Sequence, residues 1–265
     1  MTPLTRTPAP GEFLKIRHSG LIEPHGDLWG FGGLHGGLAL ALTAAAMTEQ
    51  VPGQGLRSAT VRFHRPITGP FRLETSLTHA GRTLSTATAR VSTDRGAHAD
   101  ATGVFGPSRT GTHRVVTPPA PSAPPPERCE RFVVPPEFVP VSVHTEIRPV
   151  GPDRPYAGCA EPELTAWIRL TEDDAPPDLL RLMFLMDALA PSYAAVLTAP
   201  VPIPTVQLTA HPGLGLGRTG SPWVLLRAVT HSAAENGWID EHIDAWSPDG
   251  LHLGSARQLR VVRPS

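Results

Sequence analysis

The 265-residue sequence predicts an α+β fold built from two copies of one unit. Each half contains one long apolar segment of helical character, and strand-like runs typical of an antiparallel sheet follow it. A similarity between two nine-residue runs supports the duplication. FRLETSLTH (71–79) and WVLLRAVTH (223–231) both begin with an aromatic residue and end in Thr-His. Because the same order of elements surrounds both runs, we interpret the chain as an internal repeat.

The first half begins with a Pro/Thr-rich stretch, residues 1–12, which we expect to be a loose tail. FLKIRH (13–18) predicts a first strand. A glycine-rich segment then leads into a helix expected from about Leu38 to Glu49, and its glycines would let that helix lie close against a sheet. Strand-like runs separated by turn residues follow at 56–65, 71–80, 82–93 and 98–106.

A Pro-rich stretch, residues 117–127, has no apolar face and is typical of an extended linker. After it, strand-like runs recur at 141–149, 164–170, 203–212, 221–232, 237–247 and 251–262. We therefore expect an N-terminal module over 13–110, a linker over 111–137 and a C-terminal module over 138–265.

The second long apolar segment is PPDLLRLMFLMDALAPSYAAVL, residues 176–197, which predicts a helix buried on all faces. Asp187 lies in its middle, and a buried carboxylate is costly unless it is hydrogen-bonded or functional. Pro191 has no N–H to donate to the carbonyl of Asp187, so the helix should kink or start afresh there. Two interpretations stay open on these residues alone. Asp187 either caps the second part of the broken helix or is an acid with a chemical role.

The bulk composition excludes several classes of protein. The formal net charge is −1 at pH 7, whereas a nucleic-acid-binding protein would show a basic stripe. The two cysteines, Cys129 and Cys159, lie in no metal-ligand spacing, so we expect no metal site. We see no signal-peptide pattern and no apolar run of the ~18 residues that a membrane span needs. We therefore expect a cytoplasmic protein with neither a nucleic-acid nor a membrane partner.

Several segments, taken together, resemble the type II acyl-CoA thioesterases. In the first half they are FGGLHGGLALALTAAA, RFHRP and LTHAGRTLSTATARV; in the second half they are LMDALAPS, PTVQLTAHP and SARQLRVVR. The resemblance covers nearly the whole chain and depends on the order and spacing of these segments. It implies a double hotdog fold, in which two tandem modules each wrap an antiparallel sheet around a long helix.

The resemblance also implies an activity, the hydrolysis of an acyl-CoA or a related acyl-carrier thioester by water, without a cofactor or a covalent enzyme intermediate. Carried over by motif, the catalytic residues would be Asp187, Thr205 and Gln258. A carboxylate takes a proton from water, and hydroxyl and amide groups orient that water. The sequence departs from some family members at Gln207-Leu208, where they have Asp-His. We expect the protein to be a homo-oligomer.

The glycine-rich entry to the first helix supplies the candidate substrate-binding residues His35, Gly36 and Gly37. Backbone N–H groups at a helix start suit a developing oxyanion, and the break between Asp187 and Pro191 is the other candidate donor. His35 is also the next candidate base after Asp187.

Two other functions stay open at this stage. A hotdog hydratase or dehydratase acting on acyl thioesters would show a DxNxxH-like run, which we do not find. A non-catalytic acyl-binding protein would have a degenerate site, against which the three retained polar residues argue. The absence of GxSxG argues against a Ser-His-Asp hydrolase.

One geometric expectation follows from the thioesterase hypothesis. Side chains alternate between the two faces of a strand, so Thr205 faces the helix only if Gln207 and Thr209 do so as well. Val206, Leu208 and Ala210 would then face away. This phase would place polar residues inside, and it requires a second protein layer or a wet pocket.

Overall fold

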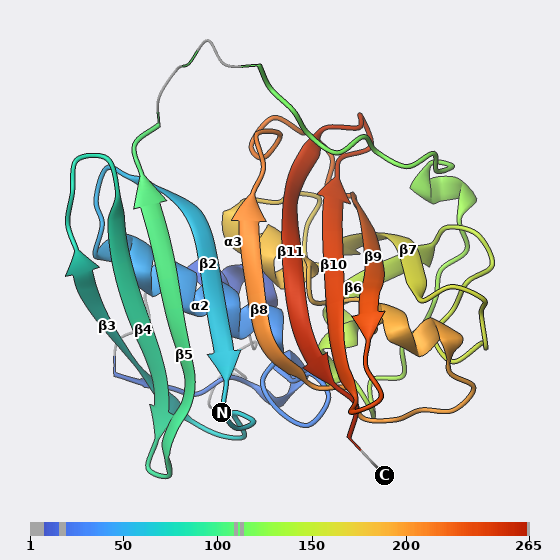
Figure 1. The fold of residues 1–265 in the computed structure, drawn as a ribbon, viewed down its shortest axis with the longest axis horizontal. Coiled ribbons are helices and arrows are strands. Elements are labelled where there is room, and N and C mark those ends of the chain that lie inside the picture. Colours follow the sequence, from blue (N-terminus) through green and yellow to red (C-terminus); the bar gives the residue numbers. More distant parts are fainter. Residues whose placement is uncertain (1–7, 16–19, 109–110, 112–113, 264–265) are drawn as a thin grey trace, which may run out of the picture.

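The computed structural model describes residues 8–15, 20–108, 111 and 114–263. Eleven strands in this part of the chain form one sheet, in which every neighbouring pair is antiparallel, and the helices lie on one of its faces (Figure 1). The strand order is β1-β3-β4-β5-β2-β8-β11-β10-β9-β7-β6. The predicted double hotdog architecture is confirmed.

The strands of the first half are β1 (Leu21–Ile22), β2 (Gly55–Phe63), β3 (Phe71–His79), β4 (Ser85–Thr93) and β5 (Gly96–Gly106). Those of the second half are β6 (Thr145–Pro149), β7 (Glu163–Leu170), β8 (Thr205–Pro212), β9 (Val224–Ala233), β10 (Trp238–Trp246) and β11 (His252–Val261). The α-helices are α1 (Pro10–Lys15), α2 (Gly36–Glu49) and α3 (Leu179–Leu185). The short 3-10 helices are η1 (Gly26–Leu28), η2 (Pro126–Arg128), η3 (Pro140–His144) and η4 (Ser192–Val196).

The internal repeat is visible in the sheet topology. Strands β2 to β5 lie in the order β3-β4-β5-β2, and β8 to β11 lie in the mirrored order β8-β11-β10-β9. The two halves meet where β2 pairs with β8, so that Thr60 lies opposite Thr209. FRLETSLTH forms β3, and most of WVLLRAVTH forms β9, which occupies the equivalent place in the second half. The similarity between the two runs therefore reflects a duplicated unit.

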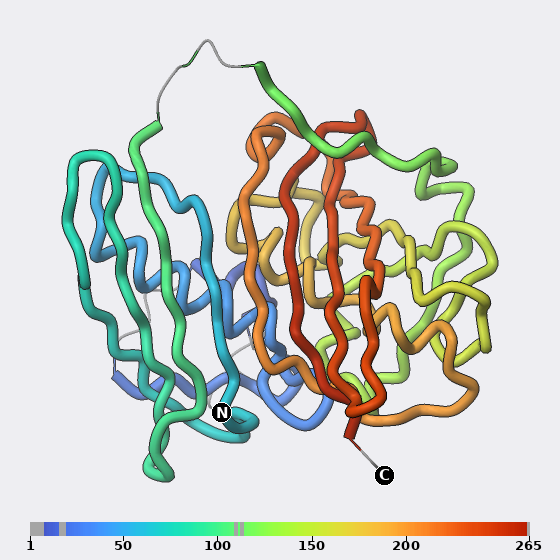
Figure 2. The backbone as a smooth tube through the Cα atoms, in the orientation of Figure 1, coloured from blue at the N-terminus to red at the C-terminus, as the bar shows by residue number. Residues whose placement is uncertain are grey.

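The core lies between the sheet and the helices. One cluster of buried apolar side chains includes residues of α2, of α3 and of strands from both halves. Leu38, Leu40 and Met47 of α2 are fully buried, because α3, α1 and the sheet each pack against part of this helix. The backbone trace in Figure 2 shows α2 and α3 behind the sheet near the boundary between the two halves. No helix of the described chain is long and apolar enough to span a membrane.

The second helix is shorter than predicted. The expected helix over 176–197 is α-helical only from Leu179 to Leu185, and the chain turns before η4 begins at Ser192. Asp178 caps the start of α3, because its Oδ1 accepts a hydrogen bond from the N–H of Arg181 at 2.9 Å. The break predicted between Asp187 and Pro191 is confirmed.

The first predicted strand, 13–18, is wrong. Residues 13–15 belong to helix α1, which begins at Pro10 within the predicted tail, and residues 16–18 lie outside the described residues. Phe13 and Leu14 are buried in the main core. Two adjacent apolar residues fit a strand or a helix equally well, so packing against α2 and α3 decides between them.

The Pro-rich linker has no helix or strand between residues 114 and 125, and it crosses to the second half as an extended segment (Figure 1). Two indole groups hold it there. Trp246 Nε1 donates to the carbonyl of Pro118 at 3.0 Å, and Trp167 Nε1 donates to that of Pro124 at 2.8 Å.

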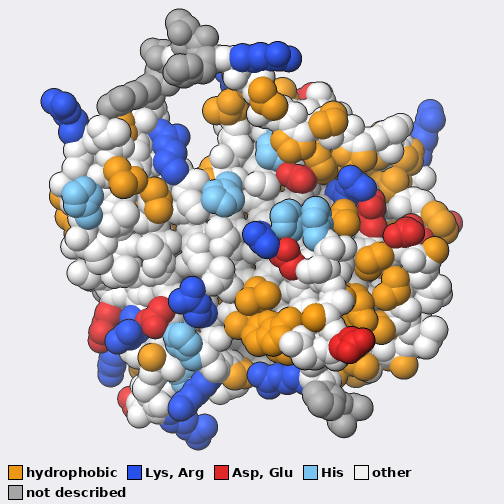
Figure 3. Space-filling view, viewed as in Figure 1, with side chains coloured by type: hydrophobic (Ala, Val, Ile, Leu, Met, Phe, Trp, Pro, Cys, Tyr) orange, Lys and Arg blue, Asp and Glu red, His pale blue; other side chains and the backbone are white. Residues whose placement is uncertain are grey.

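Figure 3 shows the sheet face that the helices do not cover. The first half has few apolar side chains on this face, because its strands β3 and β4 are rich in Ser and Thr.

Candidate active site

The candidate site lies where the end of α3 meets the start of α2. A Cβ atom at Gly36 would lie 2.6 Å from Asp187 Oδ2, and one at Gly37 would lie 2.6 Å from the carbonyl oxygen of Phe184. Only glycine permits this approach without displacing a neighbour. The glycines were expected to bring the helix close to a sheet, but at these two positions they bring α2 close to the α3 end of the other half.

The Asp187 carboxylate bridges the two halves of the molecule. Its Oδ2 accepts a hydrogen bond from the N–H of Gly37 at 2.8 Å, and its Oδ1 accepts one from Gln258 Nε2 at 2.9 Å. The guanidinium Nη2 of Arg260 lies 3.6 Å from Oδ1, and the Asp187 side chain is 9% exposed. A helix N-terminus stabilises a carboxylate through its free N–H groups and its dipole. Asp187 thus caps α2 of the first half, not the second part of its own broken helix as one interpretation had it.

His35 connects the broken helix to α2. Pro191 leaves the main-chain carbonyl of Asp187 without a helical donor, and His35 Nε2 lies 3.0 Å from that oxygen. His35 Nδ1 accepts from the N–H of Leu38 at 3.3 Å, which caps α2 and assigns the proton of the neutral ring to Nε2. Burial lowers the pKa of His35 below its ordinary value, although the nearby Asp187 opposes the shift. Both ring nitrogens of His35 are therefore used in hydrogen bonds to main-chain groups.

The phase predicted for strand β8 is wrong. Leu208 and Ala210 are buried in the main core instead of facing away from it. Gln207 Oε1 accepts from Arg62 Nη2 at 2.8 Å in an exposed contact, and Thr209 Oγ1 lies 2.9 Å from Thr60 Oγ1. The outer face of β8 is therefore polar, and its sequence does not require a second protein layer there.

A β-bulge nevertheless turns Thr205 toward the site. Gln207 pairs with Leu259 of β11, and Thr205 pairs with the next residue, Arg260, so Val206 is an extra residue without a partner. One extra residue shifts the alternation by one, so the side chain of Thr205 shares the inner face with that of Leu208. Thr205 therefore faces the helices as expected, because the bulge reverses the alternation at this end of β8.

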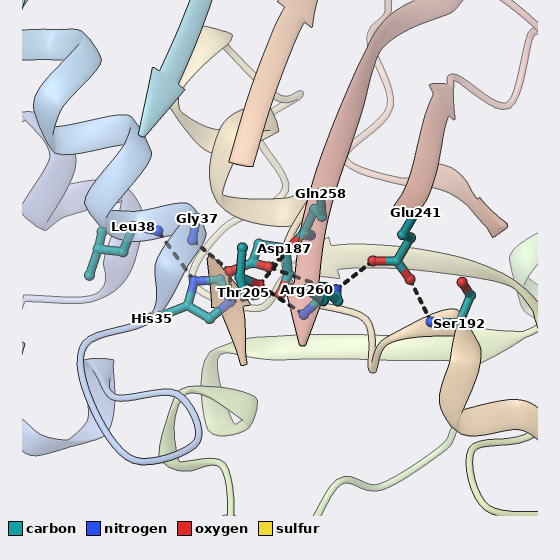
Figure 4. Close-up of polar contacts among 9 residues, drawn as sticks. All are labelled: His35, Gly37, Leu38, Asp187, Ser192, Thr205, Glu241, Gln258 and Arg260. Carbon is teal, nitrogen blue, oxygen red and sulfur yellow. Dashed lines mark hydrogen bonds and ion pairs between the residues drawn. The ribbon is translucent and has the colours of Figure 1, made fainter. Parts of the chain in front are cut away.

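The structure brings Asp187, Thr205 and Gln258 together in one chain of hydrogen bonds (Figure 4). Thr205 Oγ1 donates to Gln258 Oε1 at 2.7 Å, and Gln258 Nε2 donates to Asp187 Oδ1 at 2.9 Å. Gln258 is fully buried. A solvated glutamine is the ordinary expectation for a terminal strand, and the structure differs from it.

Sequence reasoning missed three residues that continue this chain. Arg260 Nη1 donates to Thr205 Oγ1 at 2.8 Å, and Arg260 Nε donates to Glu241 Oε2 at 2.7 Å. The other carboxylate oxygen of Glu241 accepts from the N–H of Ser192. The sequence contains a signal for this pair: Glu241 alternates in phase with Ile239 and Ile243, and Arg260 with Gln258 and Ala256.

These contacts allow the Asp187 carboxylate to act as a base. They do not pair a side-chain nucleophile with a histidine that would activate it. The serine of this hydrogen-bond chain, Ser192, has its hydroxyl oxygen 2.8 Å from Thr230 Oγ1 and not beside a histidine. Across the described ranges, no three His, Cys, Asp or Glu side chains gather in a way that could hold a metal ion. Each Asp187 oxygen accepts one hydrogen bond and keeps a second lone pair, so the carboxylate can still bind and deprotonate water.

Two family models match the chain. One is described as the acyl-CoA thioesterase C-terminal domain and matches residues 117–262, and the other is described as the acyl-CoA thioesterase N-terminal domain and matches residues 25–106. No match is found among curated proteins.

Solved structures with the same fold include three that align over nearly their full length. A conserved hot dog fold protein of unknown function from Alicyclobacillus acidocaldarius has 24% identity and a TM-score of 0.86, covering 97% of this chain and 98% of that one. A proposed thioesterase II from Thermobifida fusca has 22% identity and a TM-score of 0.82, covering 100% of both chains. The acyl-CoA thioesterase II TesB2 from Mycobacterium marinum has 18% identity and a TM-score of 0.74, covering 97% and 99%. At these identities the likeness establishes the fold.

Proposed function

We propose, from the premise that this chain belongs to the acyl-CoA thioesterase family, that it hydrolyses an acyl-CoA thioester with Asp187 as the base that activates water. The observation that carries the proposal is the position of the Asp187 carboxylate. It lies at the start of α2 and accepts hydrogen bonds from Gly37 and Gln258. A buried carboxylate held in this way is positioned for proton transfer in a site that largely excludes solvent.

The reaction needs one water and one thioester. In the proposed step the water oxygen forms a bond to the acyl carbonyl carbon while Asp187 takes one of its protons. The tetrahedral intermediate then breaks its carbon–sulfur bond, and the proton on Asp187 passes to the CoA thiolate. The products are a carboxylic acid and free CoA thiol, and the carboxylate is regenerated. Gln258 holds the carboxylate, and Thr205 holds Gln258.

The oxyanion of the intermediate requires donors, and the start of α2 offers one. The N–H of Gly37 is used by Asp187 and the N–H of Leu38 by His35 Nδ1. The N–H of Gly36 is the remaining amide of this first turn, and within the described chain it has no acceptor. We assign it as the donor to the thioester carbonyl, because helix N-termini stabilise developing negative charge.

The experiment measures thiol release from a panel of acyl-CoA esters by wild-type protein and by Asp187→Asn. Loss of the base should lower kcat by about 10²–10⁴-fold. An asparagine at 187 has one oxygen and one NH₂ group, so its NH₂ group faces a donor, either the N–H of Gly37 or Nε2 of Gln258. This mismatch adds a structural effect to the loss of the base, and a second variant separates the two effects. In Asp187→Asn combined with Gln258→Glu, the amide at 187 donates to the carboxylate at 258, and Thr205 can still donate to that carboxylate.

The double variant should recover the thermal stability that the single variant loses, yet remain as inactive as the single variant. Thiol release at the wild-type rate by Asp187→Asn would show that Asp187 has a structural role only. Wild-type protein that binds acyl-CoA but releases no thiol would favour an acyl-binding protein, and formation of an enoyl thioester from a 3-hydroxyacyl-CoA would favour a dehydratase.

A further inference from the structure

The candidate site rests on a buried ion pair that the proposed mechanism does not use. Arg260 and Glu241 are 5% and 1% exposed, and Arg260 Nε lies 2.7 Å from Glu241 Oε2. Buried charges of this kind are costly, and a well-packed apolar pair is often equally stable in their place. Stability alone therefore does not explain why these two charges are buried, and their contacts indicate another role.

The contacts of Arg260 fix the direction of the hydrogen-bond chain. A threonine hydroxyl has one hydrogen, and Arg260 Nη1 donates to Thr205 Oγ1 at 2.8 Å. Because a guanidinium group donates and never accepts, the Thr205 hydrogen is free to donate to Gln258 Oε1, at 2.7 Å. That bond orients the Gln258 amide so that its Nε2, and not its oxygen, faces the Asp187 carboxylate at 2.9 Å. Every donor in the chain then points toward Asp187.

Glu241 holds the guanidinium in place and also ties down the segment that bears the acid. One carboxylate oxygen binds Arg260 Nε, and the other accepts from the N–H of Ser192, directly after Pro191. The N–H groups of Asp187 and Ala188 still donate to the carbonyls of Phe184 and Leu185, and the chain from there to Pro191 is irregular. Glu241 thus fixes this segment from strand β10, and Figure 4 shows the carboxylate between Arg260 and Ser192.

We propose that Arg260, held by Glu241, is a positioning residue that orients Thr205 and Gln258 and keeps a positive charge beside the catalytic carboxylate. The proposal rests on the proposed thioester hydrolysis. Arg260 Nη2 lies 3.6 Å from Asp187 Oδ1, and the other groups that face this carboxylate are His35 Nε2 at 3.8 Å, the Gly37 N–H and Gln258 Nε2. Removing Arg260 should leave the Gln258 amide without a fixed orientation toward Asp187, because the Thr205 hydroxyl would no longer be held as a donor to Gln258 Oε1.

The test replaces the pair as a unit, because Arg260→Met alone would leave Glu241 buried and uncompensated. The double variant Arg260→Met with Glu241→Leu removes both charges, and Arg260→Lys keeps one charge but loses the planar fork that reaches Glu241 and Thr205 together. Arg257→Met is the matched control. It lies on the same strand, its guanidinium binds both oxygens of Asp240 at 2.7 Å, and its side chain is 64% exposed on the opposite face.

The double variant should stay folded but unfold below the wild-type temperature, because the buried N–H of Ser192 loses its acceptor. Its kcat should fall about 10²-fold from misplacement of the acid, and its KM should change little. The kcat of Arg260→Lys should lie between those of the wild-type protein and the double variant. Arg257→Met should match wild type in every measurement. A folded double variant with wild-type kcat would overturn the proposal.

A second readout keeps the proposal separate from the proposed function. The NMR signals of the Gln258 side-chain amide, compared in wild-type protein and in the double variant, need no substrate. If no thioester is hydrolysed but these signals shift or broaden in the variant, the proposed function fails and the positioning role of Arg260 stands. If hydrolysis occurs and the signals are the same in both proteins, the positioning role fails.

Discussion

Gly37 is the position where a single methyl group should separate the two halves of the site. A Cβ at this residue would lie 2.6 Å from the carbonyl oxygen of Phe184, 2.9 Å from that of Met183 and 2.9 Å from Asp187 Cβ. Two of these contacts are with backbone atoms of the α3 turn, which cannot rotate away. Gly37→Ala therefore has to push α2 and α3 apart.

The size of that movement follows from the contact distances. Ordinary contacts begin at 3.4 Å, so α2 and α3 would have to separate by about 0.8 Å at this point. The hydrogen bond from the Gly37 N–H to Asp187 Oδ2, now 2.8 Å, would lengthen toward about 3.6 Å, beyond hydrogen-bonding distance. Overpacking of a close-packed interface costs about 1–3 kcal/mol, and a misplacement of about 1 Å in a catalytic group costs about 10²-fold in rate.

Urea denaturation and thiol release measure the two consequences separately. Gly37→Ala should lower the free energy of unfolding by about 1–3 kcal/mol and kcat/KM for an acyl-CoA by about 10²-fold. Gly220→Ala is the control, since it is exposed and a Cβ there has no neighbour within 4 Å. A Gly37→Ala protein with wild-type stability and kcat/KM would refute the argument that the close approach of α2 positions Asp187.

Other predictions address the hydrogen-bond chain, the buried histidine and the linker. Thr205→Val leaves Arg260 Nη1 and Gln258 Oε1 unpaired and should lower kcat more than tenfold, whereas Thr205→Ser should retain most activity in the thiol-release assay. The lowered pKa of His35 means that the unfolded chain binds a proton near pH 6.5 that the folded protein does not. The free energy of unfolding of the wild-type protein, measured by urea denaturation, should therefore fall as pH drops below that value. It should fall less steeply in His35→Asn. Trp246→Phe removes the donor to Pro118 and should cost about 1 kcal/mol of unfolding free energy without changing kcat.

Most of the strands and the broken helix were predictable because their signals are local, although the first residues of the strand predicted over 141–149 form η3 instead. Alternation of apolar and polar residues identifies β4 and β10, and Pro191 disrupts the helix around Asp187 through its missing N–H. Helix α1 was not predictable, since Phe13 and Leu14 are adjacent apolar residues whose conformation depends on packing against α2 and α3. The length of α3 was overestimated because the apolar residues after Pro191 form η4 instead.

The site was only partly predictable for a similar reason. The resemblance to the thioesterases identified Asp187, Thr205 and Gln258 as candidate site residues. The fold brings them together from a helix end and two strands. The β-bulge at Val206 depends on pairing with β11, which lies about fifty residues away in the sequence, so simple alternation gave the wrong phase. The pair of Arg260 and Glu241 could have been found, because both charged residues occur at positions where the alternation predicts inward-facing side chains.

The central claim is that water, activated by Asp187, attacks the thioester directly. A single-turnover reaction with excess enzyme in ¹⁸O-labelled water tests it, followed by mass spectrometry of the acid product and of the peptide that contains Asp187. Direct attack by water places one ¹⁸O atom in the acid product after the first turnover and none in that peptide. An unlabelled acid product together with ¹⁸O in the Asp187 carboxylate would contradict it, because it would show that Asp187 itself attacks the acyl group.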